Sequence, residues 1–163
     1  LGEAIKYFTE ELTQAFKNNN LKTVLTKYHY PDLTPTMVDD SIGSPDGKIL
    51  IIGETNCKVK DLQGIFNAMG LKGRVECHTD YEDIQRYQFN NLMYNNKYRL
   101  IIVGPMPHST HGKDEFSSVI NRMENTEGFP CVRRATANGG LKITKTNIKQ
   151  ILREELESGF LVA

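Results

Sequence analysis

The chain has 163 residues, about the length of one domain, and can bury a hydrophobic core without disulfide or metal support. Its 20 lysine and arginine residues balance its 20 aspartate and glutamate residues, so no overall positive field favours nucleic acid or an anionic membrane. The longest apolar runs, ILII and LIIV, are too short to cross a bilayer, and the first residues lack a signal-peptide pattern. We therefore expect a cytoplasmic protein with neither a membrane nor a nucleic acid as partner.

The N-terminal part is expected to be a helical arm. Apolar residues recur at helical spacing between residues 3 and 18, and the run NNN at 18–20 ends the pattern. A short helical run at 21–30 precedes a stretch rich in proline, glycine, serine and aspartate, which is typical of a linker. We predict an arm and linker at 1–46 and a main domain at 47–163. The apolar stripe of the arm needs a partner, so we expect a homo-oligomer formed through these helices.

From Lys48 onward, strand-like and helix-like runs alternate. The expected strands are 48–53, 74–79, 98–104 and 129–136, and the expected helices are 59–70, 81–96, 114–125 and 146–157. The first and third strands are almost continuously apolar, as in a parallel sheet covered on both faces. Thr144 or Thr146 is the expected N-cap of the last helix. With right-handed crossovers, this pattern predicts an α/β fold: a four-stranded parallel sheet of order 2-1-3-4, flavodoxin-like or Rossmann-like.

In such sheets, ligands bind outside the carboxyl ends of the strands, where the strand order reverses. Here that point lies between the first and third strands, and polar residues gather in the loops that follow the first, third and fourth strands. The candidate ligand-binding residues are Glu54, Thr55, Asn56, His108, Ser109, Thr110, His111, Lys113, Thr136, Asn138 and Gly139.

The loop GPMPHSTHGKDEF, residues 104–116, allows several interpretations. His108 and His111, with His78 or Asp80, suggest a metal, but zinc needs three or four ligands in a fixed array and no third ligand can be identified, so we predict no metal site. The phosphate-binding P-loop pattern fails, because its first glycine falls on Pro107 and its hydroxyl position on Asp114.

An anionic ligand remains possible at the start of the helix that follows. The sequence HGKDEF places a glycine and Lys113 where unpaired helix amides attract anions. The first loop, GETNCK, lacks the glycine fingerprint of dinucleotide sites, so no cofactor can be assigned. The three cysteines form no Cys-x-x-Cys pair and are expected to be reduced, structural thiols.

Three stretches carry a resemblance: ILIIGETNCKVKDLQGIFNAMG, LIIVGPMPHSTHGKDEF and FPCVRRATANGG. Together, over roughly residues 48–152, the chain resembles small bacterial Rossmann-like domains of unknown function. In those domains an apolar first strand ends in glycine, and the loop after the third strand holds proline and a Ser/His pair. The resemblance implies a cytoplasmic α/β domain, often joined to other segments, and supplies no activity.

Two functions follow from these observations. The first is a non-catalytic regulatory or interaction domain, self-associating through its N-terminal helices, with a polar crevice for a small anionic or nucleotide-like ligand. The alternative is a hydrolase or nucleotide-processing enzyme that uses His108, His111 and Glu54, with or without a metal. No complete catalytic motif is present to decide whether the protein is an enzyme.

Overall fold

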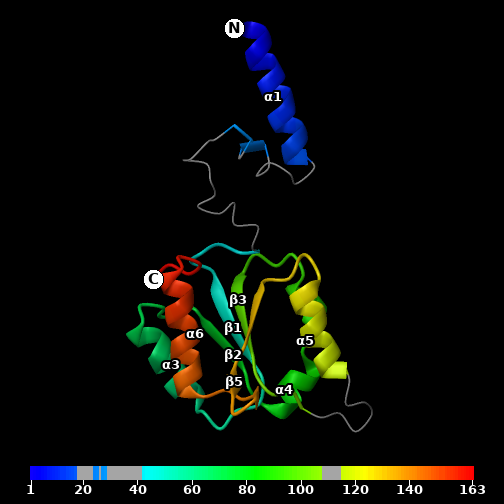
Figure 1. The fold of residues 1–163 in the computed structure, drawn as a ribbon. Coiled ribbons are helices and arrows are strands. Elements are labelled where there is room, and N and C mark those ends of the chain that lie inside the picture. Colours follow the sequence, from blue (N-terminus) through cyan, green and yellow to red (C-terminus); the bar gives the residue numbers. More distant parts are fainter. Residues whose placement is uncertain (18–23, 26, 29–41, 108–114) are drawn as a thin grey trace. The chain divides into compact units, whose positions relative to one another are not determined.

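The computed structural model describes residues 1–17, 24, 25, 27, 28, 42–107 and 115–163. The chain divides into two compact units, Leu1–Asp40 and Ser41–Ala163, and each is described by itself (Figure 1).

Unit 1 contains the expected N-terminal helix, α1, over Gly2–Lys17. Glu11 on this helix accepts hydrogen bonds from the hydroxyl of Tyr28 at 2.6 Å and from Nζ of Lys27 at 2.8 Å. The ring of Phe8 lies 4.7 Å from that of Tyr28. Ile5, on the same apolar stripe, is 58% exposed, so the described residues of unit 1 cover the stripe only in part.

Unit 2 is built on a parallel sheet of four strands. The strands are β1 (Lys48–Ile52), β2 (Val75–His78), β3 (Tyr98–Val103) and β4 (Cys131–Arg134). Their order is β2-β1-β3-β4 and every neighbouring pair is parallel. The predicted fold class and strand order are thus confirmed. All of β3 and the last four residues of β1 are buried, because helices cover both faces of the sheet.

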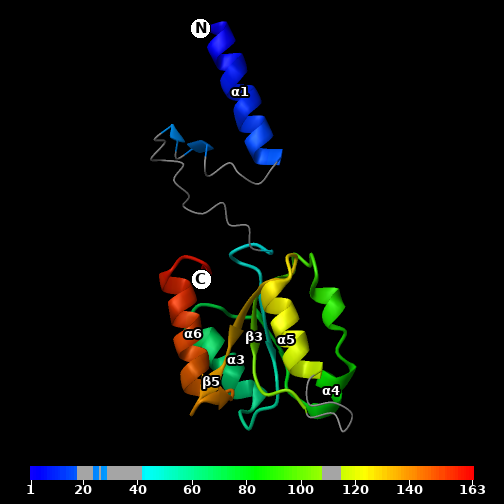
Figure 2. The same ribbon diagram turned by 45° about the vertical axis from the view of Figure 1, so that its right-hand side comes forward.

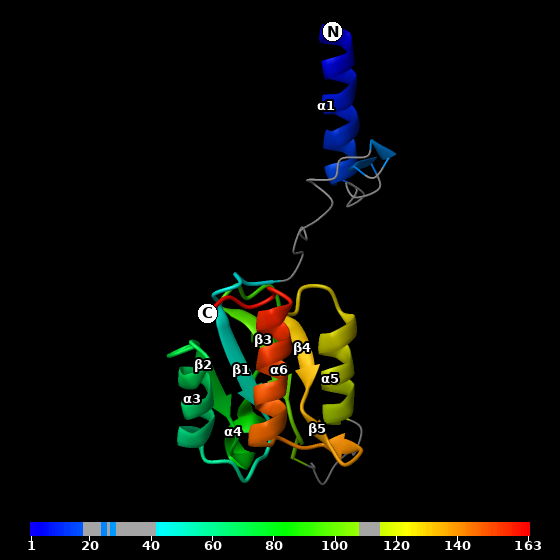
Figure 3. The ribbon, with the colours of Figure 1, turned by 60° about the vertical axis from the view of Figure 1, so that its left-hand side comes forward.

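The two helical layers lie on opposite faces of the sheet (Figures 1 and 3). One layer is α3 (Val59–Ala68) and α6 (Lys145–Glu157), and the other is α4 (Tyr81–Arg86), the 3-10 helix η2 (Phe89–Leu92) and α5 (Glu115–Asn125). Alternate residues of β1 serve the two cores: Ile49 and Ile51 pack with Leu62 and Phe66 of α3, whereas Leu50 packs in the other cluster with α4 and α5. No helix in the described part of the chain combines the length and apolar character needed to cross a membrane.

The single helix expected at 81–96 is two short helices. α4 ends at Arg86, and Tyr87 is extended, with φ −68° and ψ 127°. The reason is visible in the spacing: Phe89 follows Tyr87 by two residues, so one straight helix could not turn both rings toward the sheet. The break lets Tyr87 and Phe89 both pack against the core cluster, with their rings 5.2 Å apart.

Two arginines hold the segment before β1 and the C-terminal residues at the end of the sheet where the strands begin. Arg99 is 1% exposed; its guanidinium stacks 3.8 Å from the ring of Phe160 and donates to the carbonyl oxygens of Phe160 and Gly43, each at 3.0 Å. Arg74 donates to the carbonyl oxygens of Pro45 and Gly47, both at 2.8 Å from its Nη2. The segment that enters β1 and the C-terminal residues are therefore held on the same edge, opposite the predicted ligand site.

Candidate functional site

The site begins where the carboxyl ends of β1 and β3 meet. The amide of Glu54 donates to the carbonyl of Pro105 at 2.7 Å, and the amide of Gly104 donates to that of Ile52 at 2.8 Å. A Cβ atom on Gly53 would stand 2.6 Å from Cα of Gly104, and Gly53 has a φ of 142°. Only glycine suits this position, because the two loops touch backbone to backbone.

The loop after β4 closes on the same point. The side chain of Ile143 covers Gly104, where an added Cβ would meet it at 2.4 Å. Thr55 Oγ1 donates to the carbonyl of Ile143 at 3.2 Å and accepts from the amide of Cys57 at 3.0 Å. The loops that follow β1, β3 and β4 are therefore joined by direct contacts, and Thr55 is one of the residues that join them.

The loop after β4 contains a small hairpin that the sequence analysis missed. β5 (Thr136–Ala137) pairs antiparallel with β6 (Gly140–Leu141), close to the start of α6 (Figure 2). Asn138 and Gly139 form its turn with φ of 53° and 80°. Asn-Gly is the preferred pair where both turn residues need positive φ, so these two candidate residues have a backbone role. The hairpin is tied to α6 because Asn147 Nδ2 donates to the carbonyl of Thr136 at 3.1 Å.

Two helices begin at this end of the sheet, and their first amides are capped differently. α6 has a complete capping box: Thr144 Oγ1 accepts from the amide of Asn147 at 3.1 Å, and the side chain of Asn147 accepts from the amide of Thr144 at 2.9 Å. α3 follows Lys58, which makes no side-chain cap. The first amides of α3, those of Val59 and Lys60, have no acceptor among the described residues. These amides are open to an outside acceptor.

The charge around the start of α3 is mainly positive. Lys58, Lys60 and Lys142 are exposed and have no ion-pair partner among the described residues. Lys145 Nζ lies 2.9 Å from Asp61 Oδ2, and this hydrogen bond lowers the pKa of Asp61. Since the one acidic side chain in the first turn of α3 is neutralised by Lys145, the open amides keep their preference for an anion.

The remaining predicted residues fall into two groups. Glu54 is half-buried and Asn56 is exposed, and both side chains lack a hydrogen-bond partner within the described ranges. The other predicted residues lie outside the described part of the chain: His108, Ser109, Thr110, His111 and Lys113. Their place in the site stays a prediction.

A polar cluster on β2 went unnoticed in the sequence. His78 Nδ1 lies 2.7 Å from Oδ2 of Asp83, and its Nε2 lies 3.5 Å from Oε1 of Glu76. Glu76 also accepts from the hydroxyl of Tyr98 and pairs with Nζ of Lys97, both at 2.7 Å. Burial alone would raise the pKa of Glu76, but hydrogen bonds from Lys97, Tyr98 and His78 lower it to about 2.

The cluster combines two carboxylates, an imidazole, an ammonium group and a phenol hydroxyl. Among the residues that the structure describes, no three histidine, cysteine, aspartate or glutamate side chains are arranged to hold a metal ion. One sequence signal could have revealed part of the cluster: Glu76 and His78 are two apart in a strand and so share a face.

The three thiols are free, and each is half-buried. Burial raises the pKa of Cys77 to about 11 and also raises that of Cys131. Cys57 packs against the core cluster near Ile143. Their positions agree with the structural role expected from the sequence.

No family model matches the sequence, and neither a curated protein nor a solved structure matches it. The function is therefore argued from the site itself.

Proposed function

We propose that unit 2 is a non-catalytic regulatory or interaction domain that binds a small anionic, nucleotide-like ligand at the carboxyl edge of its sheet. The observation that carries this proposal is the start of α3, where the amides of Val59 and Lys60 have no acceptor among the described residues, beside the joined loops of β1, β3 and β4. Phosphate and carboxylate groups bind helix amino ends of this kind.

The neighbouring charges and the fold support the same choice. Lys58 and Lys60 add two exposed cations next to the free amides. The strand order reverses between β1 and β3, which is where open α/β sheets bind ligands. Glu54, by contrast, limits how closely a highly charged ligand approaches, which favours a monophosphate over a triphosphate.

A thermal-shift panel of inorganic phosphate, sugar phosphates and nucleoside monophosphates tests the proposal. A ligand that binds only the folded state raises the melting temperature. We expect a rise that Lys58→Glu abolishes and that Lys72→Glu leaves unchanged. Lys72 is the matched control, because it is also exposed and lies just beyond the other end of α3. The proposal is refuted if no phosphorylated compound raises the melting temperature, or if Lys58→Glu responds like the unmodified protein.

The same panel addresses the loop at 104–116. If His108 and His111 take part in the site, His108→Ala and His111→Ala will each reduce the rise produced by the best ligand. Unchanged rises in both variants would restrict the site to the start of α3.

We also propose that the protein self-associates through α1. Ile5 and Phe8 are 58% and 41% exposed on the same apolar stripe of the helix, and a second copy of the chain would cover them. Light scattering on variants of this stripe tests the proposal.

A further inference from the structure

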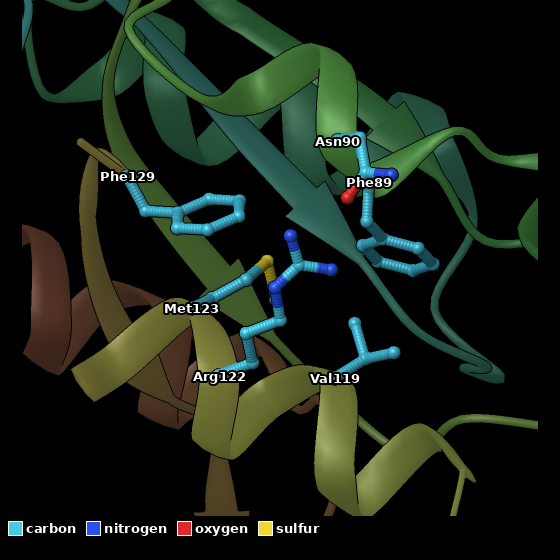
Figure 4. Close-up of a pocket in the computed structure, with 6 residues that line it drawn as sticks. All are labelled: Phe89, Asn90, Val119, Arg122, Met123 and Phe129. Atoms are coloured by element: carbon cyan, nitrogen blue, oxygen red, sulfur yellow. The ribbon is translucent and has the colours of Figure 1, made fainter. Parts of the chain in front are cut away.

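A pocket lies on the opposite face of the sheet from α3. It opens between η2, α5 and the segment that leads into β4, and has a volume of about 210 Å³ (Figure 4). Its lining residues are Phe89, Asn90, Val119, Arg122, Met123 and Phe129. None of these residues belongs to the carboxyl-edge site, so the pocket is a separate feature of unit 2.

Four of the six residues that line the pocket are apolar, and they lie in or against the core. Met123 is 2% exposed and Phe129 is 8% exposed, and both belong to the hydrophobic core of this face. Val119 and Phe89 are half-buried and pack against the same core. Such walls favour an apolar ring or branched chain over a sugar or a hydrated phosphate.

One charged side chain, that of Arg122, lines the pocket. Figure 4 shows the guanidinium of Arg122 reaching into the space that the rings of Phe89 and Phe129 flank. It lies 5.8 Å from the centre of the Phe129 ring, and its Nη2 lies 3.8 Å from Sδ of Met93. The aromatic face and the sulfur orient the guanidinium without neutralising its charge.

No carboxylate in the described part of the chain neutralises Arg122. The nearby acid on its own helix, Glu124, is taken by Arg134, whose Nε and Nη2 lie 2.7 and 2.6 Å from its two oxygens. A bound carboxylate could accept two parallel hydrogen bonds from Arg122 in the same way.

We propose that this pocket binds a small organic monocarboxylate whose apolar ring packs between Phe89, Val119 and Phe129, with the carboxylate on Arg122. The volume of about 210 Å³ corresponds to roughly seven waters at about 30 Å³ each, which suits one ring bearing one carboxylate. Inorganic phosphate is excluded by the same features, since a single guanidinium and the amide of Asn90 offer too few donors for a dianion among apolar walls.

Phenylacetate is the probe, and its binding is followed by NMR of the uniformly labelled full chain. We expect saturable shifts of the backbone amides of Val119, Arg122, Met123 and Phe129 below about 10 mM ligand, because so small a ligand binds weakly even in a good pocket. Phenylacetamide, which keeps the ring and lacks the charge, should bind about tenfold more weakly or worse.

Two arginine variants locate the charge. Arg122→Gln keeps an exposed polar side chain on α5 and should weaken phenylacetate binding by about 10- to 100-fold, as expected when a charged hydrogen-bond pair is lost. Arg153→Gln is the matched control, because Arg153 is exposed on α6, at the other face of the sheet, and should leave the affinity unchanged.

Several outcomes would overturn the proposal. It fails if phenylacetate causes no saturable shifts, if the shifts map to residues of α3 or to the loop at 53–58, or if Arg122→Gln binds as well as Arg153→Gln. A third variant, Val119→Phe, places a ring in the pocket from a half-buried position and should reduce binding of phenylacetate and phenylacetamide alike. The carboxyl-edge site is unaffected by all of these results, since its own test uses phosphorylated compounds and Lys58.

Discussion

Arg99 is the most deeply buried charged side chain among the described residues. It is 1% exposed, stacks on Phe160 and satisfies two backbone carbonyls that lie far apart in the sequence. Such a group contributes through packing, through its hydrogen bonds and through the ring contact.

We predict that Arg99→Ala lowers the free energy of unfolding by about 2–4 kcal/mol, because two carbonyls lose their donor and a cavity forms against Phe160. Urea denaturation measures the change. Arg86→Ala is the control: Arg86 pairs with Glu82 at 3.4 Å, both side chains are 80% exposed, and its loss should cost less than about 0.5 kcal/mol. Equal effects of the two substitutions would contradict the role given to Arg99.

The lowered pKa of Glu76 predicts how the stability of the protein depends on pH. Its pKa in the folded protein is lowered from 4.5 to about 2, so the folded state favours the ionised carboxylate. The stabilisation is fully present above about pH 4.5 and is lost as the pH falls toward about 2. In Glu76→Gln, we expect the free energy of unfolding to fall less steeply over this range than in the unmodified protein.

Urea denaturation at several pH values measures the slope. Glu157→Gln, an exposed change at the end of α6, is the control and should keep the slope of the unmodified protein. A slope in Glu76→Gln as steep as that of the control would show that the cluster around Glu76 contributes nothing to acid sensitivity.

The partners of Glu76 show why parts of a site escape prediction. Its place on β2 next to His78 could be read from the alternation of a strand, but Tyr98 begins β3, and β1 lies between the two strands. The contact therefore depends on the strand order and on the reach of two long side chains across β1. Neither the strand order nor this reach can be read from the spacing of residues in the sequence.

Among the elements, α6 offers the cleanest test of a predicted cap. The sequence left Thr144 and Thr146 as alternatives, and the structure selects Thr144, which forms a capping box with Asn147. We predict that Thr144→Ala lowers the free energy of unfolding by about 1 kcal/mol, since the amide of Asn147 loses its acceptor. Thr146→Ala, a change of the same size two residues along, should cost less than about 0.5 kcal/mol. Thermal unfolding of both variants decides, and a larger loss in Thr146→Ala would contradict the assignment.

The sheet was predictable because its signals are strong and local. Continuous apolar runs mark β1 and β3 as covered on both faces, and right-handed crossovers then restrict the strand order. The prediction of one helix at 81–96 was wrong in its middle. The apolar pattern over a long window looks helical and hides the two-residue spacing of Tyr87 and Phe89. The hairpin after β4 was missed although Asn138-Gly139 is a strong turn signal, since strands of two residues leave no periodicity to detect.

The candidate site was predictable in position and less so in detail. The rule that ligands bind where strand order reverses directed attention to the loops after β1, β3 and β4, and those loops do contact one another. It could not show that Thr55 and Asn138 serve the backbone, or that α3 starts without a cap. Those facts depend on hydrogen bonds between segments far apart in the sequence, such as that from Thr55 to residue 143.

In unit 2, the amino ends and the carboxyl ends of the strands carry different features. The amino edge fixes the entering segment and the C-terminal residues through Arg74 and Arg99, while the carboxyl edge carries the loops and the open start of α3. The contacts that hold the segment before β1 and the C-terminal residues therefore lie at the opposite end of the strands from the proposed ligand site. The pocket at Arg122 lies between η2, α5 and the segment before β4, on the other face of the sheet from α3.

Self-association concerns the whole molecule and rests on α1. If a second copy covers the stripe, Ile5→Lys should weaken the dimer by at least about tenfold, because two apolar side chains would be lost from one interface and two charges placed there. Light scattering over a range of protein concentrations measures the mass. The control is Gln14→Lys. Gln14 is exposed on the opposite side of the helix from Ile5, so a charge added there faces away from the stripe. Circular dichroism confirms that both variants keep their helices. A monomer at every concentration, or the same dimer content in Ile5→Lys and Gln14→Lys, would exclude α1 as the contact, and the exposed stripe would then need another partner.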